Sequence, residues 1–196
     1  MASPDKSNGY EEIAPDYIAA RGQNSSGIGA SVVAEWSKTL PGACTVLDLG
    51  CGNGVPISQA LIERGLNVRA IDASPRMVAA FRSRFPNVPV ECAAVEDCNF
   101  FGMTFDAVVA WGLFFLLDAP IQLNLIQKIS TSLKSGGHFL FTAPSQICTW
   151  LDSMTDRTSF GLGRAAYQQA LESASMSLIA TATDEGENHC YFAQKT

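Results

Sequence analysis

Two aspartates and three glycines have the types and spacing of a ligand site. Asp48 belongs to a short apolar run, and Gly50, Gly52 and Gly54 follow at alternate positions. Glycine is needed where the backbone adopts a positive φ or lies directly against a ligand, so the triplet predicts a tight turn under a flat molecule. Asp72 comes 22 residues after Gly50. Its carboxylate can accept two hydrogen bonds from the diol of a ribose.

The glycine spacing also indicates which kind of nucleoside fits. A dinucleotide turn reads G-x-G-x-x-G/A, so that a helix start can meet a pyrophosphate. Here position 55 is valine and the pattern is G-x-G-x-G. This spacing suits a ligand with a ribose and an adenine but no phosphate. A nicotinamide-dependent oxidoreductase is therefore the less favoured alternative.

The segments around these residues alternate between strand-like and helix-like patterns. Strands are predicted at 46–49, 67–72, 88–92, 105–110 and 138–142. Helices are predicted in the second half of 10–21 and at 28–40, 56–64, 74–85, 118–135 and 164–173. Residues 177–183 and 189–194 predict a terminal hairpin, and 144–163 is expected to be irregular. This alternation predicts an α/β fold, a doubly wound and mostly parallel sheet with helices on both faces.

Composition limits the function classes. A chain of 196 residues fits one domain with at most a small lid. The net charge of −6 and the lack of a basic face make nucleic acid a poor partner. Residues 1–9 are polar and expected to be loose, with no apolar core of a signal peptide. The longest apolar run, 105–117, is too short to span a membrane. A cytoplasmic protein with no membrane partner is expected.

Six cysteines are distributed along the chain without a CxxC pair. Because several lie in apolar strand-like runs, they are interpreted as small, buried, reduced thiols rather than metal ligands. They are Cys44, Cys51, Cys92, Cys98, Cys148 and Cys190. No metal site is predicted.

The run Val-Leu-Asp-Leu-Gly-Cys-Gly-Asn-Gly at 46–54 resembles the first motif of the class I S-adenosylmethionine-dependent methyltransferases. The resemblance extends from about Tyr10 to the C-terminus and is closest to small bacterial members that act on small molecules. It implies a Rossmann-like sheet of seven strands whose last strand is antiparallel. It also implies transfer of a methyl group from S-adenosylmethionine to a small-molecule acceptor by in-line displacement.

The resemblance implies a residue for each part of this cofactor. The methionine part would lie at Gly50, Cys51 and Gly52, beside Asp48, and the sulfonium would lie over Ala110 and Trp111. The ribose hydroxyls would be held by Asp72, the adenosine would contact Ala73 and Met77, and the adenine would be bordered by Val95 and Glu96. The cofactor would be closed over by Tyr17 and Arg21. Relatives commonly have an aspartate where this chain has Ala94. The adenine amino group is then met by Glu96, by Asp97 or by backbone alone.

The sequence says less about the binding site of the methyl acceptor. Residues 1–40 are predicted to form a helical cap over the cofactor site, and 41–196 the core domain. Substrate selection is assigned to the N-terminal helices and to residues 146–163, with Trp150 and Phe160 as walls. His189 is a weak candidate for a general base. Monomer and homodimer both stay open, and a non-catalytic cofactor-binding module of the same fold is the alternative to an enzyme.

Overall fold

The computed structural model describes residues 5–196. The helices are α1 (Tyr10–Ala20), α2 (Ala30–Ser37), α3 (Ile57–Glu63), α4 (Pro75–Arg84), α5 (Ala119–Ser132) and α6 (Arg164–Ser173), with short 3₁₀ turns η1 (Phe100–Gly102) and η2 (Phe114–Leu116). The strands are β1 (Thr45–Leu49), β2 (Asn67–Asp72), β3 (Val90–Cys92), β4 (Phe105–Ala110), β5 (Leu133–Thr142), β6 (Ile147–Leu151), β7 (Thr158–Leu162), β8 (Met176–Thr183) and β9 (His189–Lys195).

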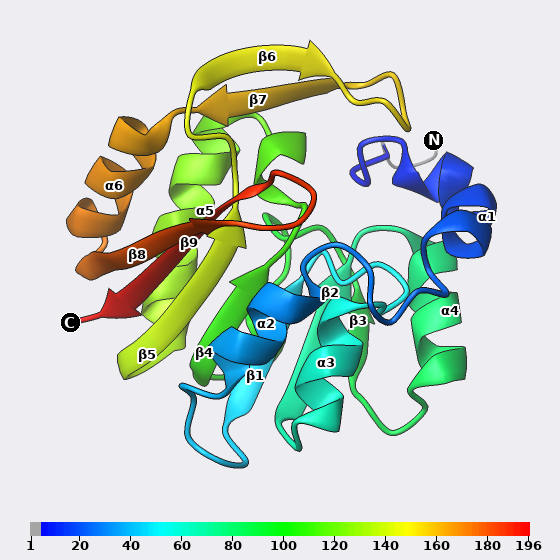
Figure 1. Cartoon of the computed structure of the whole chain (residues 1–196), viewed down its shortest axis with the longest axis horizontal. Helices are drawn as coiled ribbons and strands as arrows, with labels where there is room; N and C mark the ends of the chain where they lie inside the picture. The colour runs from blue at the N-terminus through cyan, green and yellow to red at the C-terminus, as the bar shows by residue number, and fades with distance from the viewer. Residues whose placement is uncertain (1–4) are drawn as a thin grey trace.

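Seven strands form one sheet in the order β3-β2-β1-β4-β5-β9-β8 (Figure 1). Pairing is parallel from β3 to β5, and β9 is antiparallel to both of its neighbours, β5 and β8. The predicted fold class and the antiparallel last strand are therefore confirmed. The parallel strands end at one edge of the sheet, where Figure 1 shows the β6–β7 hairpin and the β8–β9 turn above β4 and β5.

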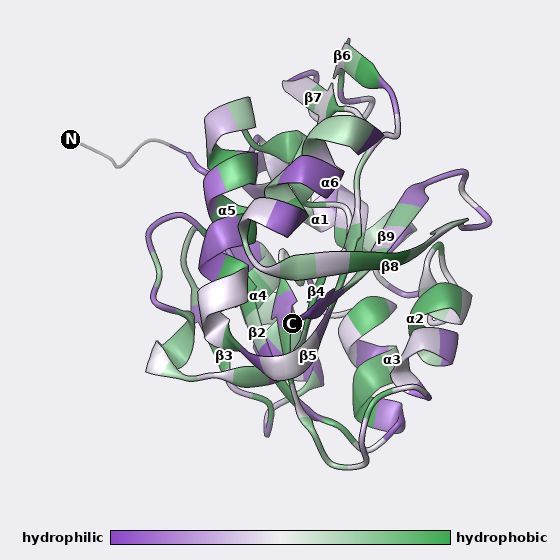
Figure 2. Cartoon of the chain, turned by 90° about the vertical axis from the view of Figure 1, so that its left-hand side faces the viewer, coloured by the Kyte–Doolittle hydropathy of each residue, from purple (hydrophilic) through white to green (hydrophobic). Residues whose placement is uncertain are grey.

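Helices cover both faces of the sheet (Figure 2). On one face, α2 and α3 pack on β1, β2 and β4 through buried residues such as Val33, Leu61 and Val46. On the other face, α5 and α6 cover the second set of alternating strand residues. Two-sided burial explains why β1 and β4 read as continuous apolar runs.

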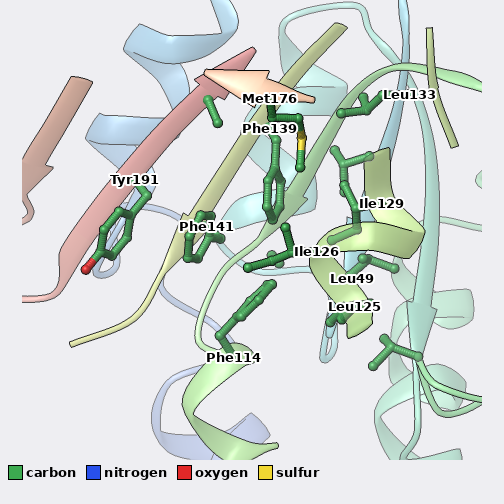
Figure 3. Close-up of a cluster of buried hydrophobic side chains, with 14 of the residues drawn as sticks. Leu49, Phe114, Leu125, Ile126, Ile129, Leu133, Phe139, Phe141, Met176 and Tyr191 are labelled. Carbon is green, nitrogen blue, oxygen red and sulfur yellow. The ribbon is translucent and has the colours of Figure 1, made fainter. Parts of the chain in front are cut away.

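Aromatic rings fill the core under α5 and α6 (Figure 3). Phe139 and Phe141 stack with ring centroids 4.8 Å apart, and Tyr191 stacks on Phe141 at 4.7 Å. Phe114, from η2, packs its ring 4.6 Å from Phe141. This cluster ties β5, β9 and the segment after β4 together beneath the carboxyl edge of the sheet.

The glycine turn after β1 has the conformation that its sequence predicts. Gly50, Gly52 and Gly54 have φ of 70°, 55° and 86°, values that L side chains adopt at a cost. A Cβ on Gly54 would lie 2.5 Å from the ring of Phe85 and 2.9 Å from that of Phe81. Helix α4 can therefore pack directly against the turn, which positions the end of β2 beside it.

Local signals account for several boundaries. Ser74 caps α4 as predicted, because its Oγ accepts a hydrogen bond from the Met77 N–H at 3.1 Å. Asp118 stands at the N-cap of α5 without a side-chain bond. That helix ends at Ser132, before the predicted stop at Gly136, and β5 begins at once. Pro15 lies inside α1 rather than near its start.

The prediction of an irregular segment at 144–163 was wrong. Residues 147–151 and 158–162 form the β6–β7 hairpin, with Trp150 opposite Ser159 and Thr149 opposite Phe160. Among the described residues the hairpin pairs only with itself, and the residues of β6 are half-buried or exposed rather than buried. We call this hairpin the β6–β7 arm.

Polar contacts fasten the N-terminal helices to the core. The Glu11 carboxylate accepts hydrogen bonds from Ser74 Oγ and from the Arg76 N–H, which holds α1 over the start of α4. Residues 1–9 were predicted to be loose; residues 1–4 lie outside the described residues. In the rest, the Asp5 carboxylate accepts from the N–H groups of Ser7 and Gly9 at 2.9 and 3.0 Å.

The described cysteines are all free thiols, and the prediction of burial holds for some of them. Cys44, Cys51 and Cys190 are buried, but Cys92 is exposed, because its edge strand β3 has one uncovered face. Among residues 5–196, no helix is both long and apolar enough to cross a membrane.

Candidate functional site

A cavity of about 540 Å³ opens at the carboxyl ends of β1, β2 and β4. It brings together nearly all of the residues that the sequence predicts for a cofactor. These are Tyr17, Arg21, Asp48, Gly50, Cys51, Gly52, Asp72, Ala73, Met77, Val95, Glu96 and Trp111. Ala110 is not among the lining residues: it is the last residue of β4 and is fully buried in the sheet. We call this space the first cavity.

Asp72 is held at the end of β2 by two backbone donors. Its Oδ2 accepts the Gly52 N–H and its Oδ1 the Ser74 N–H, both at 2.8 Å. Burial raises the pKa of the Asp72 carboxyl, and these two hydrogen bonds oppose that rise. The carboxylate thus links the glycine turn to the start of α4 and stays at the wall of the cavity.

Asp48 is the more deeply buried carboxyl, with 1% of its surface exposed. Burial raises its pKa to about 7, and the neighbouring Asp72 adds to the rise, while a hydrogen bond from Ser58 Oγ opposes it. Two carboxyls with raised pKa values beside one cavity disfavour a further negative charge there. The same pair favours a ligand that carries positive charge.

The loop after β3 forms the far wall of the first cavity. Lys128 fixes it from α5, because its Nζ donates to the carbonyl oxygens of Val95 at 2.6 Å and Glu96 at 3.3 Å. Lys6 forms an ion pair with Glu96 Oε1 at 3.3 Å and with Asp97 Oδ2 at 2.7 Å. Glu96 Oε2 is buried without a hydrogen-bond partner. Of the two acidic residues left open by the sequence, only Glu96 lines the cavity.

Tyr17 and Arg21 lie side by side along α1 at the mouth of the first cavity. Tyr17 packs edge-on against Tyr10, with ring centroids 5.7 Å apart, and burial raises the pKa of both phenols. Arg21 is exposed and has no carboxylate within ion-pair distance in the described part of the chain. Its guanidinium is therefore available to an anionic group in the cavity.

The turn after α1 is anchored on the glycine motif itself. The Gly22 carbonyl accepts from Asn53 Nδ2 at 2.8 Å and from Arg84 Nη1 at 2.6 Å. Further along, a Cβ on Gly29 would lie 2.3 Å from the Trp111 ring, so the chain before α2 passes directly over that ring. Both contacts hold the N-terminal segment against the cavity.

Several lining residues were missed by sequence reasoning. They include Lys6, Ser7, Asn8, Asn53, Leu113, Phe115, Thr142 and Asn188. Asn53 lies inside the glycine motif, and Leu113 and Phe115 follow the end of β4, so the strand-end rule could have found them. Lys6, Ser7 and Asn8 carry no such signal, because polar residues near a chain end usually indicate a loose segment.

A second cavity of about 460 Å³ adjoins the first, and the two share Phe115, Thr142 and Asn188. The β6–β7 arm covers it with Trp150, whose ring lies 5.6 Å from that of Phe115. His189 lines this second cavity and not the first. Burial, and then the nearby Arg164, lower the pKa of its imidazole.

Comparisons with known proteins agree with this geometry. A family model described as a methyltransferase domain matches residues 46–137, which run from β1 to the start of β5. Over this stretch the chain is similar to a methyltransferase domain, and its fold is that of S-adenosylmethionine-dependent methyltransferases of known structure. The matched region contains the glycine turn, Asp72 and the loop at Glu96, so it supplies three walls of the first cavity.

Curated relatives of the chain include the cypemycin N-terminal methyltransferase of Streptomyces, 37% identical over 113 residues, which cover 56% of this chain and 46% of the relative. The chain spans less than half the length of the curated relatives that it matches. Solved structures with the same fold include the CcbJ methyltransferase of Streptomyces caelestis, with a TM-score of 0.77, 14% identity and full coverage of both chains. Another is an amino pentose methyltransferase of Micromonospora echinaspora, with a TM-score of 0.73, 17% identity, and 94% and 97% coverage of this and that chain.

Proposed function

We propose that this chain binds S-adenosylmethionine in the first cavity and transfers its methyl group to a small-molecule acceptor. The observation that supports this most is the position of Asp72, held by the Gly52 N–H at the wall of a cavity that Glu96 also lines. A carboxylate at a strand end beside a glycine turn can accept hydrogen bonds from a ribose diol, which is how such folds bind a nucleoside.

The residues present fit this cofactor. Glu96 Oε2 is buried without a partner, and the amino group of an adenine is a donor that can satisfy it. A Cβ on Gly52 would meet nothing within 4 Å, so the backbone there faces open space against which a ligand can lie. Arg21 is available for the cofactor carboxylate, and the carboxyls of Asp48 and Asp72 favour its positive charges.

The chain's own residues have positioning tasks in this proposal. Asp72 holds the ribose hydroxyls, Gly50 to Gly52 support the methionine part, and Tyr17 with Arg21 closes the mouth. Residues 1–40 then serve as a cap over the cofactor and 41–196 as the core. When bound, the cofactor supplies a methyl group on a positively charged sulfur, and the acceptor atom bonds to that carbon as the carbon–sulfur bond breaks and its electron pair stays on the sulfur. Alignment and exclusion of water are the main requirements for such a displacement.

The second cavity is the proposed acceptor site. It meets the first at Phe115, Thr142 and Asn188, so a molecule in one lies next to a molecule in the other. Two proteins to which the chain is similar are the cypemycin N-terminal methyltransferase and an amino pentose methyltransferase. A cavity of about 460 Å³ suits a small molecule or the end of a chain rather than a folded partner.

Replacing Arg21 with alanine is expected to weaken binding of S-adenosylhomocysteine about tenfold and to change the melting temperature little. The guanidinium is exposed and makes no ion pair with the described residues, so its loss removes a contact to the ligand carboxylate only. Isothermal calorimetry and thermal unfolding measure the two effects. Arg64→Ala, an exposed position after α3, is the matched control. A large fall in melting temperature with normal affinity would contradict the assignment.

The proposed function is tested by incubating the chain with methyl-labelled S-adenosylmethionine and a broad panel of small molecules. We expect label to appear on at least one acceptor, and S-adenosylhomocysteine but not NAD to raise the melting temperature. Binding of the cofactor without transfer across the panel would favour the non-catalytic module. Absence of binding would overturn the proposal.

A further inference from the structure

The second cavity is lined by groups that attract a cation. Asp152 and Glu187 contribute carboxylates, and no lysine or arginine is among the lining residues in the described part of the chain. Trp150 and Phe115 contribute two ring faces, their centroids 5.6 Å apart. Aromatic faces and carboxylates together are the usual partners of an organic ammonium. The same set repels a carboxylate or a phosphate.

His189 adds an acceptor to this set. Its Nε2 is buried and has no hydrogen-bond partner, whereas most buried polar atoms in proteins have one. The imidazole packs edge-on against Tyr191 at 4.7 Å, which fixes its plane. Its lowered pKa leaves it neutral at pH 7, so one ring nitrogen can accept a hydrogen bond from an N–H.

The turn that carries Glu187 and His189 is internally fixed. The Asp184 carboxylate accepts from the N–H groups of Gly186 and Asn188, both at 2.8 Å, and from Asn188 Nδ2 at 2.9 Å. Glu187 has a left-handed backbone with φ of 62°, a conformation that costs free energy in a non-glycine residue. Asp184 therefore holds Glu187 at the cavity. The carboxylate of Glu187 makes no ion pair with the described residues.

The other charged and titratable groups near His189 do not change this balance. Asp152 is partly engaged, because its Oδ1 accepts the N–H groups of Met154 and Thr155 and its Oδ2 lies 3.4 Å from the hydroxyl of Tyr10. Cys148 also lines the cavity as a free thiol. Arg164, at the start of α6, acts on His189 from outside the lining and would oppose an ammonium there.

We propose that the acceptor is an amine on an apolar, ring-sized body, bound as its ammonium between Trp150, Glu187 and His189. This inference rests on the proposed function, because it assigns the second cavity to the acceptor. The ring lies against Trp150 and Phe115, the ammonium faces Glu187, and one of its N–H groups donates to His189. The ammonium nitrogen has no free electron pair, so this proton passes to the imidazole of His189 before the nitrogen bonds to the methyl carbon. An acceptor with a carboxylate or phosphate in the same place would meet two carboxylates and no lining cation.

Matched probes test this choice. The full chain is first saturated with S-adenosylhomocysteine, whose binding is followed by calorimetry, and is then titrated with 2-phenylethylamine or with 3-phenylpropanoate. The two probes share a ring and differ in the sign of their charge. We expect the amine to bind at least about tenfold more tightly than the acid.

Three variants locate the effect. We expect Trp150→Ala, Glu187→Gln and His189→Phe each to weaken amine binding by about threefold or more, with S-adenosylhomocysteine binding unchanged. Glu172→Gln, an equal change of charge on the exposed face of α6, should leave it unaltered. Thermal unfolding shows which variants fold.

The outcomes separate the two proposals. If S-adenosylhomocysteine binds and the acid binds as tightly as the amine, or neither probe binds, the amine assignment is wrong and the proposed function stands. Amine binding that none of the folded variants weakens would overturn the assignment to this cavity. If S-adenosylhomocysteine itself fails to bind, the proposed function is overturned.

Discussion

Asp72→Ala is expected to weaken binding of S-adenosylhomocysteine more than tenfold. In the proposed complex the carboxylate accepts hydrogen bonds from the ribose hydroxyls, and a charge-assisted hydrogen bond is worth about 1.5–3 kcal/mol. The substitution also removes the acceptor of the Gly52 and Ser74 N–H groups, which loosens the turn that the ligand lies on. Isothermal calorimetry on the folded variant measures the loss.

Two controls isolate the ribose contact. Asp72→Asn keeps the shape of the side chain and one acceptor oxygen, so we expect it to lose less affinity than the alanine variant. Asp16→Ala removes the same charge from an exposed position on α1 and should leave affinity within about twofold. An unchanged dissociation constant for a folded Asp72→Ala protein would count against the assigned role.

Asp48→Asn is expected to stabilise the ligand-free chain at neutral pH. The buried carboxyl has a pKa of about 7 against an ordinary value of 3.8. A rise of that size corresponds to a cost on the order of 4 kcal/mol when the group must be charged. Asparagine carries no charge and can still accept from Ser58 Oγ, so it avoids that cost.

The direction of the Asp48 pKa shift gives the pH range over which the free energy of unfolding changes. Below pH 3.8 the carboxyl is protonated in both states and costs nothing. From there to about pH 7 the unfolded chain has lost the proton and the folded chain keeps it, so the wild-type free energy of unfolding falls as pH rises. The advantage of Asp48→Asn should therefore grow across this window and then level off. Urea unfolding of both proteins at several pH values measures it.

Asp106→Asn is the control of opposite sign. Burial alone would raise the pKa of the Asp106 carboxyl, but hydrogen bonds from Lys134 Nζ and the Thr45 N–H hold that pKa below its ordinary value. Removing that carboxylate should cost stability at neutral pH and cost little in acid. A constant difference between Asp48→Asn and the wild type at all pH values would show that Asp48 is not the buried acid described.

The parts of the fold that follow from local physics were predictable from sequence. Strands β2 and β4 have the predicted bounds, because β4 is apolar except for Asp106 and β2 lies between Gly65 and the helix start at Ser74. The conformation of the glycine turn and the Ser74 cap follow from residue types alone. The β6–β7 arm was missed because Ile147 and Leu151 point to solvent, with 86% and 65% of their surfaces exposed, so no regular alternation of apolar and polar residues appears.

The residues of the candidate site likewise divide into those that the sequence predicts and those that it does not. Most residues at the ends of β1 and β2 were found, because topology brings those ends together, but Thr142 at the end of β5 was missed. Ala110, at the end of β4, is fully buried and does not line the first cavity, whereas the next residue, Trp111, does. Lys6 and Asn8 reach the cavity only through long-range contacts, such as the ion pair of Lys6 with Glu96. Contacts of that kind depend on tertiary packing and leave no local pattern.

The most direct test of the nucleoside site is a crystal structure of the full chain grown with S-adenosylhomocysteine. The account predicts electron density for the ligand in the first cavity, with both ribose hydroxyls on the Asp72 carboxylate and the adenine amino group at Glu96. Density elsewhere, or an empty first cavity with Asp72 bonded only to Gly52 and Ser74, would contradict it.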